Sequence, residues 1–559
     1  MYSSVHIVHN IEFPRMNALV LLLAVLLYSV KAQQNTTDEK YYTYNAAIVE
    51  YNPSSYNSLS LKERATAVAT AYISLLDNVT EDIDLILFPE STLGGESTEV
   101  PEPFTEIICN STDTRYEDYL KDFSCAAIEH NTTVVINIVE KENCTLKNST
   151  GFCPSSGIVY YNADIAFNES GGVSGKYHKW NLFGEYQKSP PAEVELTVIT
   201  TKNNNSFGIF TCFDILFDEP ALNLTKNLGL MNILFPTMWF SELPFLTALQ
   251  VQQMWAEENN VNLLSAGANS PSVGSGGTGV FVGNKGPSEY AMIGGSGGTR
   301  LIIKTVPKLE IENNPYTEFS PIEEDVDSIA SEMDSFRLKS DSSIINDANS
   351  TLLDTSKTTI AQEVCAGDTV KICCEFNVII SINETLSNAT EGNQYVYHLV
   401  AYDDARTFDG VRDGGIELCG ILACLNDSRS SCGQRFSNYS DIVWPITFEN
   451  ISVSATFAND ATRIQFPNSL LASIRPLSPQ YTRWDKEETD GIVKRTHSIT
   501  RSQNRLLTFG IYGRDFSRDS PVRESTSGAS SLFFTNISKE PDSEAELMPH
   551  PVYKCNTIS

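Results

Sequence analysis

The sequence contains a glutamate, a lysine and a cysteine that together could hydrolyse an amide. Each of these three residues ends or interrupts an apolar segment. Glu90 follows the run LILFP, Lys179 lies in the polar break of KYHKWNLFGE, and Cys212 follows FGIFT at the edge of an expected strand. Amide hydrolysis needs a nucleophile, a base that later acts as an acid, and donors for the oxyanion. We therefore predict that Glu90, Lys179 and Cys212 are catalytic.

Each of the three residues, taken alone, has a simpler interpretation. Glu90 would then cap a helix, Lys179 would be a solvated charge, and Cys212 would be a small buried apolar residue. In open α/β sheets, however, ligands bind outside the carboxyl ends of the strands. Residues that follow different strands can meet there, so the functional interpretation depends on all three together.

The expected reaction passes through a thioester on Cys212. A nearby ammonium such as that of Lys179 favours the reactive thiolate. Glu90 would take the thiol proton, pass it to the departing amine and then activate water. Lys179 and the backbone N–H of Phe213 would hold the oxyanion, and the scheme needs no metal and no organic cofactor.

Two glycine-rich runs match known sequence motifs, but the secondary structure expected around each run does not fit its motif. Residues 274–279 satisfy G-x-G-x-x-G, but the apolar run VFV that follows predicts a strand where a dinucleotide site needs a helix. Residues 294–298 satisfy G-x-S-x-G between YAMI and RLIIK, which favours a flexible hairpin loop over a nucleophile elbow. We assign chemistry to neither run.

The first half of the chain alternates short apolar runs with helical patterns. NAAIVEY, IDLILF, TVVINIVEK, GIVYYNADIAF, FGIFTC, MNILFP and NLLSAGA predict strands, whereas LKERATAVATAYISLLDNV and FLTALQVQQMWAEENN predict helices. This alternation indicates an α/β domain over about 40–310.

The remaining part of the chain changes character twice. Residues 311–360 are acidic and rich in Ser and Asp, with little helical periodicity, so we expect a linker or a surface excursion. Residues 361–545 then carry strand-like runs, among them KICCEFNVIISI, YVYHLVAYD, IELCGILAC, SVSATFA, LLTFGIYG and SLFFTN. They indicate a second, β-rich domain before a tail at 546–559.

The composition restricts the partners. Among 559 residues, 39 Lys and Arg face 70 Asp and Glu, which gives a net charge of −31. Such a surface repels polyanions, so we expect neither nucleic acid nor an anionic lipid surface as a partner.

The amino-terminal segment 1–32 indicates a cleaved secretion signal behind a long extension, with a retained signal anchor as the alternative. NALVLLLAVLLYSV is too short to span a bilayer comfortably, and small residues follow it. The tail lacks the hydrophobic end of a glycolipid-anchor signal, so we expect a secreted protein without a stable membrane anchor. Sixteen Asn-x-Ser/Thr acceptors support this route: Asn35, Asn78, Asn110, Asn131, Asn143, Asn148, Asn168, Asn204, Asn223, Asn349, Asn383, Asn388, Asn426, Asn438, Asn450 and Asn536.

Secretion changes the interpretation of the 12 cysteines, because thiols outside the cell close into disulfides. Spacing makes two local bridges plausible, one between Cys109 and Cys125 and one between Cys144 and Cys153. Seven cysteines in the last third indicate a disulfide-stapled second domain, although spacing does not fix their pairing. The alternative is a zinc site at 419–432, which the lack of a nearby histidine pair disfavours.

The order Glu, Lys, Cys in these local contexts resembles the nitrilase superfamily of carbon–nitrogen hydrolases, and within it the vanin and biotinidase family. FPES, KYHKWNLFGE, GIFTCFDILF and FPTMW carry the resemblance, which extends through KICC and LCGILACLNDSRSSCG into the second domain, over about 42–540.

The resemblance implies a fold, further site residues and a substrate. The fold is an α-β-β-α sandwich followed by the β-rich, disulfide-stapled domain. Glu185 resembles the superfamily's second glutamate. Apart from the resemblance, Trp239, Phe240 and Trp255 are candidates to line the crevice, although we expect core packing for at least two of them. The implied substrate is the small molecule pantetheine, cleaved to pantothenate and cysteamine. A biotinidase-type activity on biotinyl amides and a catalytically inactive binding protein are the alternatives.

Overall fold

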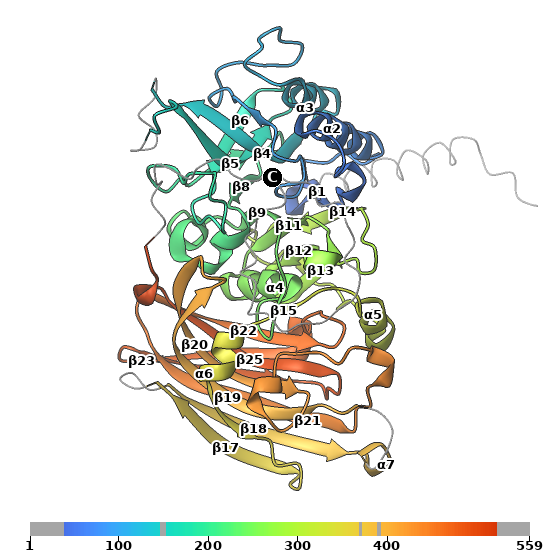
Figure 1. Cartoon of the computed structure of the whole chain (residues 1–559), viewed down its shortest axis with the longest axis vertical. Coiled ribbons are helices and arrows are strands. Elements are labelled where there is room, and N and C mark those ends of the chain that lie inside the picture. The colour runs from blue at the N-terminus through green and yellow to red at the C-terminus, as the bar shows by residue number, and fades with distance from the viewer. Residues whose placement is uncertain (1–38, 146–152, 368–371, 388–392, 522–559) are drawn as a thin grey trace, which may run out of the picture.

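The computed structural model describes residues 39–145, 153–367, 372–387 and 393–521. It has two parts stacked along the long axis, an α/β domain and a β-rich domain (Figure 1). This confirms the predicted fold class of an α-β-β-α sandwich followed by a β-rich, disulfide-stapled domain. The predicted signal segment, the strand SLFFTN and the tail lie outside the described residues.

The first sheet of the α/β domain has seven strands in the order β14-β1-β2-β4-β5-β6, with β3 beside β4. β2, between β1 and β4, is parallel to both and completely buried, which explains its uninterrupted apolar sequence LIL. The strands are β1 (Thr43–Glu50), β2 (Leu85–Leu87), β3 (Ser97–Thr98), β4 (Thr133–Asn143), β5 (Ile158–Phe167), β6 (Val173–His178) and β14 (Arg300–Pro307).

The second sheet has six strands in the order β13-β12-β11-β9-β8-β7. β8, β9 and β11 run parallel and are largely buried, so their carboxyl ends lie at one edge. The strands are β7 (Val198–Thr200), β8 (Ser206–Ile209), β9 (Asn232–Thr237), β11 (Asn262–Gly267), β12 (Thr278–Val282) and β13 (Gly286–Ala291). The apolar faces of the two sheets share one core.

Helices cover the outer faces of both sheets. α2 (Leu61–Asp77) and α3 (Asp118–Glu129) pack on the first sheet, and α4 (Ala248–Asn259) packs on the second. α2 begins at a capping box in which Ser60 and Glu63 bond each other's backbone N–H. The sequence analysis predicted α2 and α4 but not α3.

The β-rich domain consists of two five-stranded antiparallel sheets. The third sheet has the order β16-β19-β20-β25-β22 and the fourth the order β17-β18-β21-β24-β23. The strands are β16 (Asn349–Leu352), β17 (Thr359–Ala366), β18 (Ile372–Ile382), β19 (Val396–Phe408), β20 (Arg412–Cys424), β21 (Ile446–Ala458), β22 (Arg463–Leu471), β23 (Thr482–Thr489), β24 (Ile492–Ile499) and β25 (Leu506–Asp515).

Burial patterns show which of these sheets is internal. β20 and β25 are buried almost throughout, whereas β18 alternates buried and exposed residues. The third sheet therefore lies inside the molecule, and the fourth presents one face to solvent.

Helix α4 joins the two domains because it lies between the second and third sheets (Figure 1). Its buried glutamines reach across: Gln250 Nε2 donates to Asn468 Oδ1 at 2.6 Å, and Gln253 Nε2 donates to the Leu477 carbonyl at 2.5 Å. Buried amides need such partners. The interface between the domains therefore resembles a packed interior.

The acidic segment 311–360 is more than a linker or surface excursion. It forms α5 (Val326–Glu332), β15 (Lys339–Ser340) and α6 (Ser342–Asp347), and it buries several apolar side chains, namely Ala330, Met333, Phe336, Ile344 and Ile345. Asp325 and Asp341 cap the two helices with their side chains. Acidic residues that suggested an unstructured stretch therefore begin two short helices.

The glycine-rich run 294–298 is also placed differently from the prediction. It connects β13 in the second sheet to β14 in the first, so it crosses between the layers and closes no hairpin. Residues 278–282, within and after the other glycine-rich run, form strand β12 as expected.

Five disulfides are present among the described residues. Cys109 pairs with Cys125 and Cys144 with Cys153, the same pairs that the spacing suggested. The second domain contains Cys365–Cys373, Cys374–Cys419 and Cys424–Cys432, and Cys555 lies outside the described part. Cys374–Cys419 links β18 to β20 and thus ties the two sheets of this domain together. No helix within the described ranges has the length and apolar character needed to cross a bilayer.

We predict that the disulfide between the sheets stabilises the protein more than a bridge within one hairpin. Loop entropy gives about 4 kcal/mol for the 45-residue separation of Cys374 and Cys419. It gives about 2.5 kcal/mol for the 8-residue separation of Cys365 and Cys373. In urea unfolding, the double alanine variant of the first pair should show the lower midpoint, and the reverse order would contradict this account.

Candidate active site

The predicted residues converge where strands of the two facing sheets end. Glu90 follows β2, Lys179 follows β6, and Cys212 follows β8. All three side chains are buried. The structure therefore brings together, between the sheets, three residues that are up to 122 positions apart in the sequence (212 − 90).

The Glu90 carboxylate accepts hydrogen bonds from three directions. Lys179 Nζ donates to Oε1 at 2.8 Å, Asn162 Nδ2 donates to Oε1 at 2.7 Å, and the Met238 N–H donates to Oε2 at 2.8 Å. Met238 directly follows β9. These donors replace the water that the buried carboxylate has lost and fix its orientation.

Lys179 is held between two carboxylates. Its Nζ lies 3.2 Å from Glu185 Oε2 as well as 2.8 Å from Glu90 Oε1. Burial alone would lower the pKa of this ammonium, but Glu185 and Glu90 together raise it well above its usual range. Lys179 is therefore a fixed cation, suited to stabilising negative charge rather than to carrying protons.

Glu185 lies where the resemblance predicted a second glutamate. Its Oε1 accepts from Asn162 Nδ2 at 2.5 Å, so this amide bridges the carboxylates of Glu90 and Glu185. Burial favours the neutral acid, yet the charges of Lys179 and Lys188, together with Asn162, lower the pKa of Glu185 below its usual value. Glu185 is thus an anion that helps to keep Lys179 charged.

Cys212 begins a 3-10 turn, Cys212–Leu216, and its backbone is left-handed with φ 49°. Burial and the charge of Glu90 raise the pKa of its thiol well above the usual range, although Lys179, the Thr237 hydroxyl and the Met238 N–H act in the opposite direction. Lys179 lowers the pKa of the Cys212 thiol, as expected. The increase in this pKa caused by burial and by Glu90 is larger. The side chain of Cys212 is therefore a neutral thiol at rest.

The turn that carries Cys212 is anchored by a second buried carboxylate, Asp214. Its Oδ2 accepts from the Tyr177 hydroxyl at 2.7 Å and from the Thr211 N–H at 3.0 Å, while Oδ1 accepts from the backbone and side-chain nitrogens of Asn181, both at 2.8 Å. Burial raises the pKa of Asp214 to about 6. The sequence analysis did not identify Asp214. The available signal was an acidic residue in an otherwise apolar run, two positions after Cys212.

A cavity opens beside the thiol, lined mainly by aromatic and aliphatic side chains. The α/β domain contributes Phe183, Cys212, Phe213, Leu216, Met238, Trp239, Phe240, Glu242 and Leu246, and the second domain contributes Phe408 and Asp409. Of the three aromatic candidates, Trp239 and Phe240 line the cavity. Trp255 instead packs in the core, with its ring 5.2 Å from that of Phe210.

Asn162 was missing from the sequence-based site. It lies inside the apolar strand β5, with its neighbours Tyr161 and Ala163 buried. An uncharged polar residue in a buried strand was the available signal, because such a group needs a partner. The sequence did not show that the partners would be Glu90 and Glu185.

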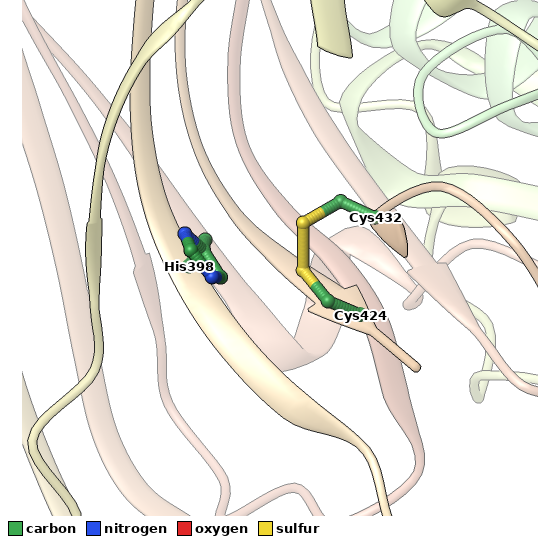
Figure 2. Close-up of side chains that lie close together, drawn as sticks. All are labelled: His398, Cys424 and Cys432. Atoms are coloured by element: carbon green, nitrogen blue, oxygen red, sulfur yellow. A yellow bond between two sulfur atoms is a disulfide. The ribbon is translucent and has the colours of Figure 1, made fainter. Parts of the chain in front are cut away.

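The zinc alternative is contradicted by the cysteine pairing. Cys419 is bonded to Cys374, and Cys424 is bonded to Cys432, so these sulfurs are not thiolates that could bind a metal. Figure 2 shows His398 beside the Cys424–Cys432 bridge. Its Nε2 already contacts the Asp427 carbonyl at 3.0 Å.

Twelve of the sixteen predicted glycosylation acceptors fall within the described residues, and all twelve are exposed or half-exposed. Asn35, Asn148, Asn388 and Asn536 lie outside them.

Comparison with known proteins identifies both domains. Residues 45–266 match the carbon-nitrogen hydrolase family, and residues 336–519 match the vanin C-terminal domain. Vanin-like protein 1 of Drosophila melanogaster is 32% identical over 525 residues, which cover 90% of each chain. Human pantetheinase is 27% identical over 499 residues, which cover 85% of this chain and 90% of that protein. The solved structure of Nit3 of Saccharomyces cerevisiae, a nitrilase-superfamily member, aligns with 48% of this chain and 90% of its own at 19% identity and a TM-score of 0.36.

The sandwich fold and the family match define a carbon–nitrogen hydrolase that acts on bonds other than peptide bonds. With the second domain included, the chain belongs to the vanin family of this superfamily.

We predict that Glu90→Gln makes Cys212 easier to alkylate while abolishing amide hydrolysis. Removing the Glu90 charge removes one of the two causes that raise the thiol pKa. The pH profile of iodoacetamide alkylation should therefore move to lower pH.

Glu185→Gln is the matched control for this experiment, because its carboxylate also contacts Lys179 but is not among the groups that raise the thiol pKa. A profile that stays in place or moves to higher pH in Glu90→Gln would contradict the electrostatic account.

Proposed function

We propose that the protein is a pantetheine hydrolase in which Cys212 is the nucleophile, Glu90 the proton carrier, and Lys179 with the Phe213 N–H the oxyanion site. The observation that carries the proposal is the buried cluster of Glu90, Lys179 and Cys212, whose cysteine lines an aromatic cavity. Glu185 assists by keeping Lys179 charged.

Acylation begins from the neutral thiol. As Sγ attacks the amide carbonyl carbon, the thiol proton passes to Glu90, so a free thiolate need not accumulate. The carbonyl oxygen becomes an oxyanion, which Lys179 and the Phe213 N–H stabilise. When the C–N bond breaks, Glu90 returns the proton to the departing amine and a thioester remains on Cys212.

Deacylation repeats the same proton transfers with water. Glu90 takes a proton from the water as its oxygen attacks the thioester carbon, and the same oxyanion site is used again. Collapse of this intermediate breaks the C–S bond, returns the proton to the sulfur and releases a carboxylic acid. The cycle is balanced with one water consumed per amide.

Pantetheine is the substrate that the relatives favour. Proteins named pantetheinase from human and cattle are each 27% identical to this chain over most of its length. The cavity beside Cys212 suits a neutral, flexible molecule, because apolar side chains line most of it. Hydrolysis would yield pantothenate and cysteamine.

Secretion is part of the same proposal. Five disulfides among the described residues fit an oxidising compartment. The apolar segment at 17–30 would act as the signal for export.

The test is to incubate the purified protein with pantetheine and with biotinyl-lysine and to measure the free amines. Wild type should release cysteamine, and Cys212→Ala should lower that rate by at least about 10³-fold because no thioester can form. The two proteins should have the same melting temperature.

Other outcomes of this assay separate the alternatives. Release of lysine without cysteamine would replace the pantetheine assignment by a biotinidase-type activity. Full activity in Cys212→Ala would overturn the catalytic scheme, and folded wild type that cleaves neither amide would overturn the substrate assignment.

A further inference from the structure

The second domain reaches the turn that carries the nucleophile. The tip of the β19–β20 hairpin, residues 408–412, lies against it: the Phe408 ring is 5.5 Å from that of Phe213 and 6.1 Å from that of Phe217. Phe213 and Phe217 are themselves 4.9 Å apart. Aromatic packing therefore connects the hairpin tip to the residue directly after Cys212.

Arg412, at the base of this tip, holds the anchor of the turn. Its Nη1 donates to Asn181 Oδ1, and its guanidinium lies 3.9 Å from the centre of the Phe217 ring. Asn181 in turn donates twice to Asp214 Oδ1, at 2.8 Å each. Arg412 is thus linked through Asn181 to the carboxylate of Asp214, which anchors the turn that begins at Cys212.

Arg514, on β25, holds the end of the turn directly. Its Nη1 donates to the carbonyl oxygen of Leu216, and its guanidinium lies 5.2 Å from the Phe217 ring. The side chain is 1% exposed and is fixed on its own side by the Gly415 carbonyl at 3.1 Å and by Asp519. A buried guanidinium in which each of the three nitrogens donates a hydrogen bond has little freedom to move.

The turn needs this support because its first residue is strained. Cys212 has φ 49°, a left-handed conformation that is unfavourable for a residue with a side chain and persists only where the surroundings impose it. Thr211 and Asp214 hold the start of the turn from within the α/β domain. Arg412, Arg514 and Phe408 add support at its far end from the second domain.

We infer that Arg412 and Arg514 are positioning residues that hold the Cys212–Leu216 turn so that the Phe213 N–H points at the oxyanion. The inference rests on the proposed function, because it assigns these arginines to the oxyanion site of that reaction. It gives the second domain a part in catalysis without placing any of its charged groups on the reacting atoms.

The test compares Arg412→Gln and Arg514→Gln with wild type on pantetheine. Displacement of an oxyanion donor should lower kcat by roughly 10–100-fold with little change in KM, since ground-state contacts remain. Alkylation of Cys212 by iodoacetamide forms no oxyanion, so its rate should stay within about threefold of wild type. A merely loosened fold would instead change KM and the alkylation rate as well.

Arg495→Gln is the matched control. Arg495 is another buried arginine of the second domain that pairs across the interface, with Glu258 of α4, but it lies outside the set of side chains that hold the turn. Its kcat should remain within about twofold of wild type.

Arg412 is half-buried, so Arg412→Gln decides the matter if Arg514→Gln fails to fold. A folded Arg412→Gln variant with unchanged kcat, or with kcat and alkylation reduced equally, would overturn the inference and leave the proposed function intact. Wild type that releases no cysteamine would count against the proposed function itself.

Discussion

The buried ion pair between Glu90 and Lys179 is the interaction on which the rest of the site depends. Two charges removed from water are costly, and their mutual attraction compensates only when the remaining hydrogen-bonding positions are also filled. Asn162, the Met238 N–H and Glu185 fill those positions. The pair then sets the chemistry: Glu90 helps to keep the thiol neutral at rest, and Lys179 remains a cation that can meet charge developing on the substrate.

The second domain completes the site rather than merely following it in the sequence. It covers α4, it supplies Phe408 and Asp409 to the cavity wall, and its arginines reach the nucleophile turn. In a nitrilase-type sandwich, helices form the outer layers. Here the third sheet also packs against one of these helices, α4. This arrangement places residues from two separately patterned parts of the chain around the sulfur of Cys212.

Much of the fold could be predicted because apolar runs such as LILF and the helix pattern of LKERATAVATAYISLLD are local signals. Glu90, Lys179 and Cys212 could be proposed from local signals too, since Glu90 and Cys212 each follow an apolar run and Lys179 lies in a polar break with aromatic neighbours. Asn162, Arg412 and the raised pKa of the thiol could not, because they depend on which distant residues meet after folding. The acidic segment 311–360 was misjudged because two of its aspartates cap helices too short to show a periodic pattern.

Cys212 is the one cysteine of the described residues without a disulfide partner, and this bears on how the disulfides form. Ten described cysteines are oxidised while Cys212 stays free, with its side chain almost enclosed. The two bridges of the α/β domain span only 16 and 9 residues, so their partners meet far more often than either meets Cys212 in the unfolded chain. The short separations therefore favour pairing of these four cysteines with each other over pairing with Cys212, which is consistent with the free thiol at Cys212.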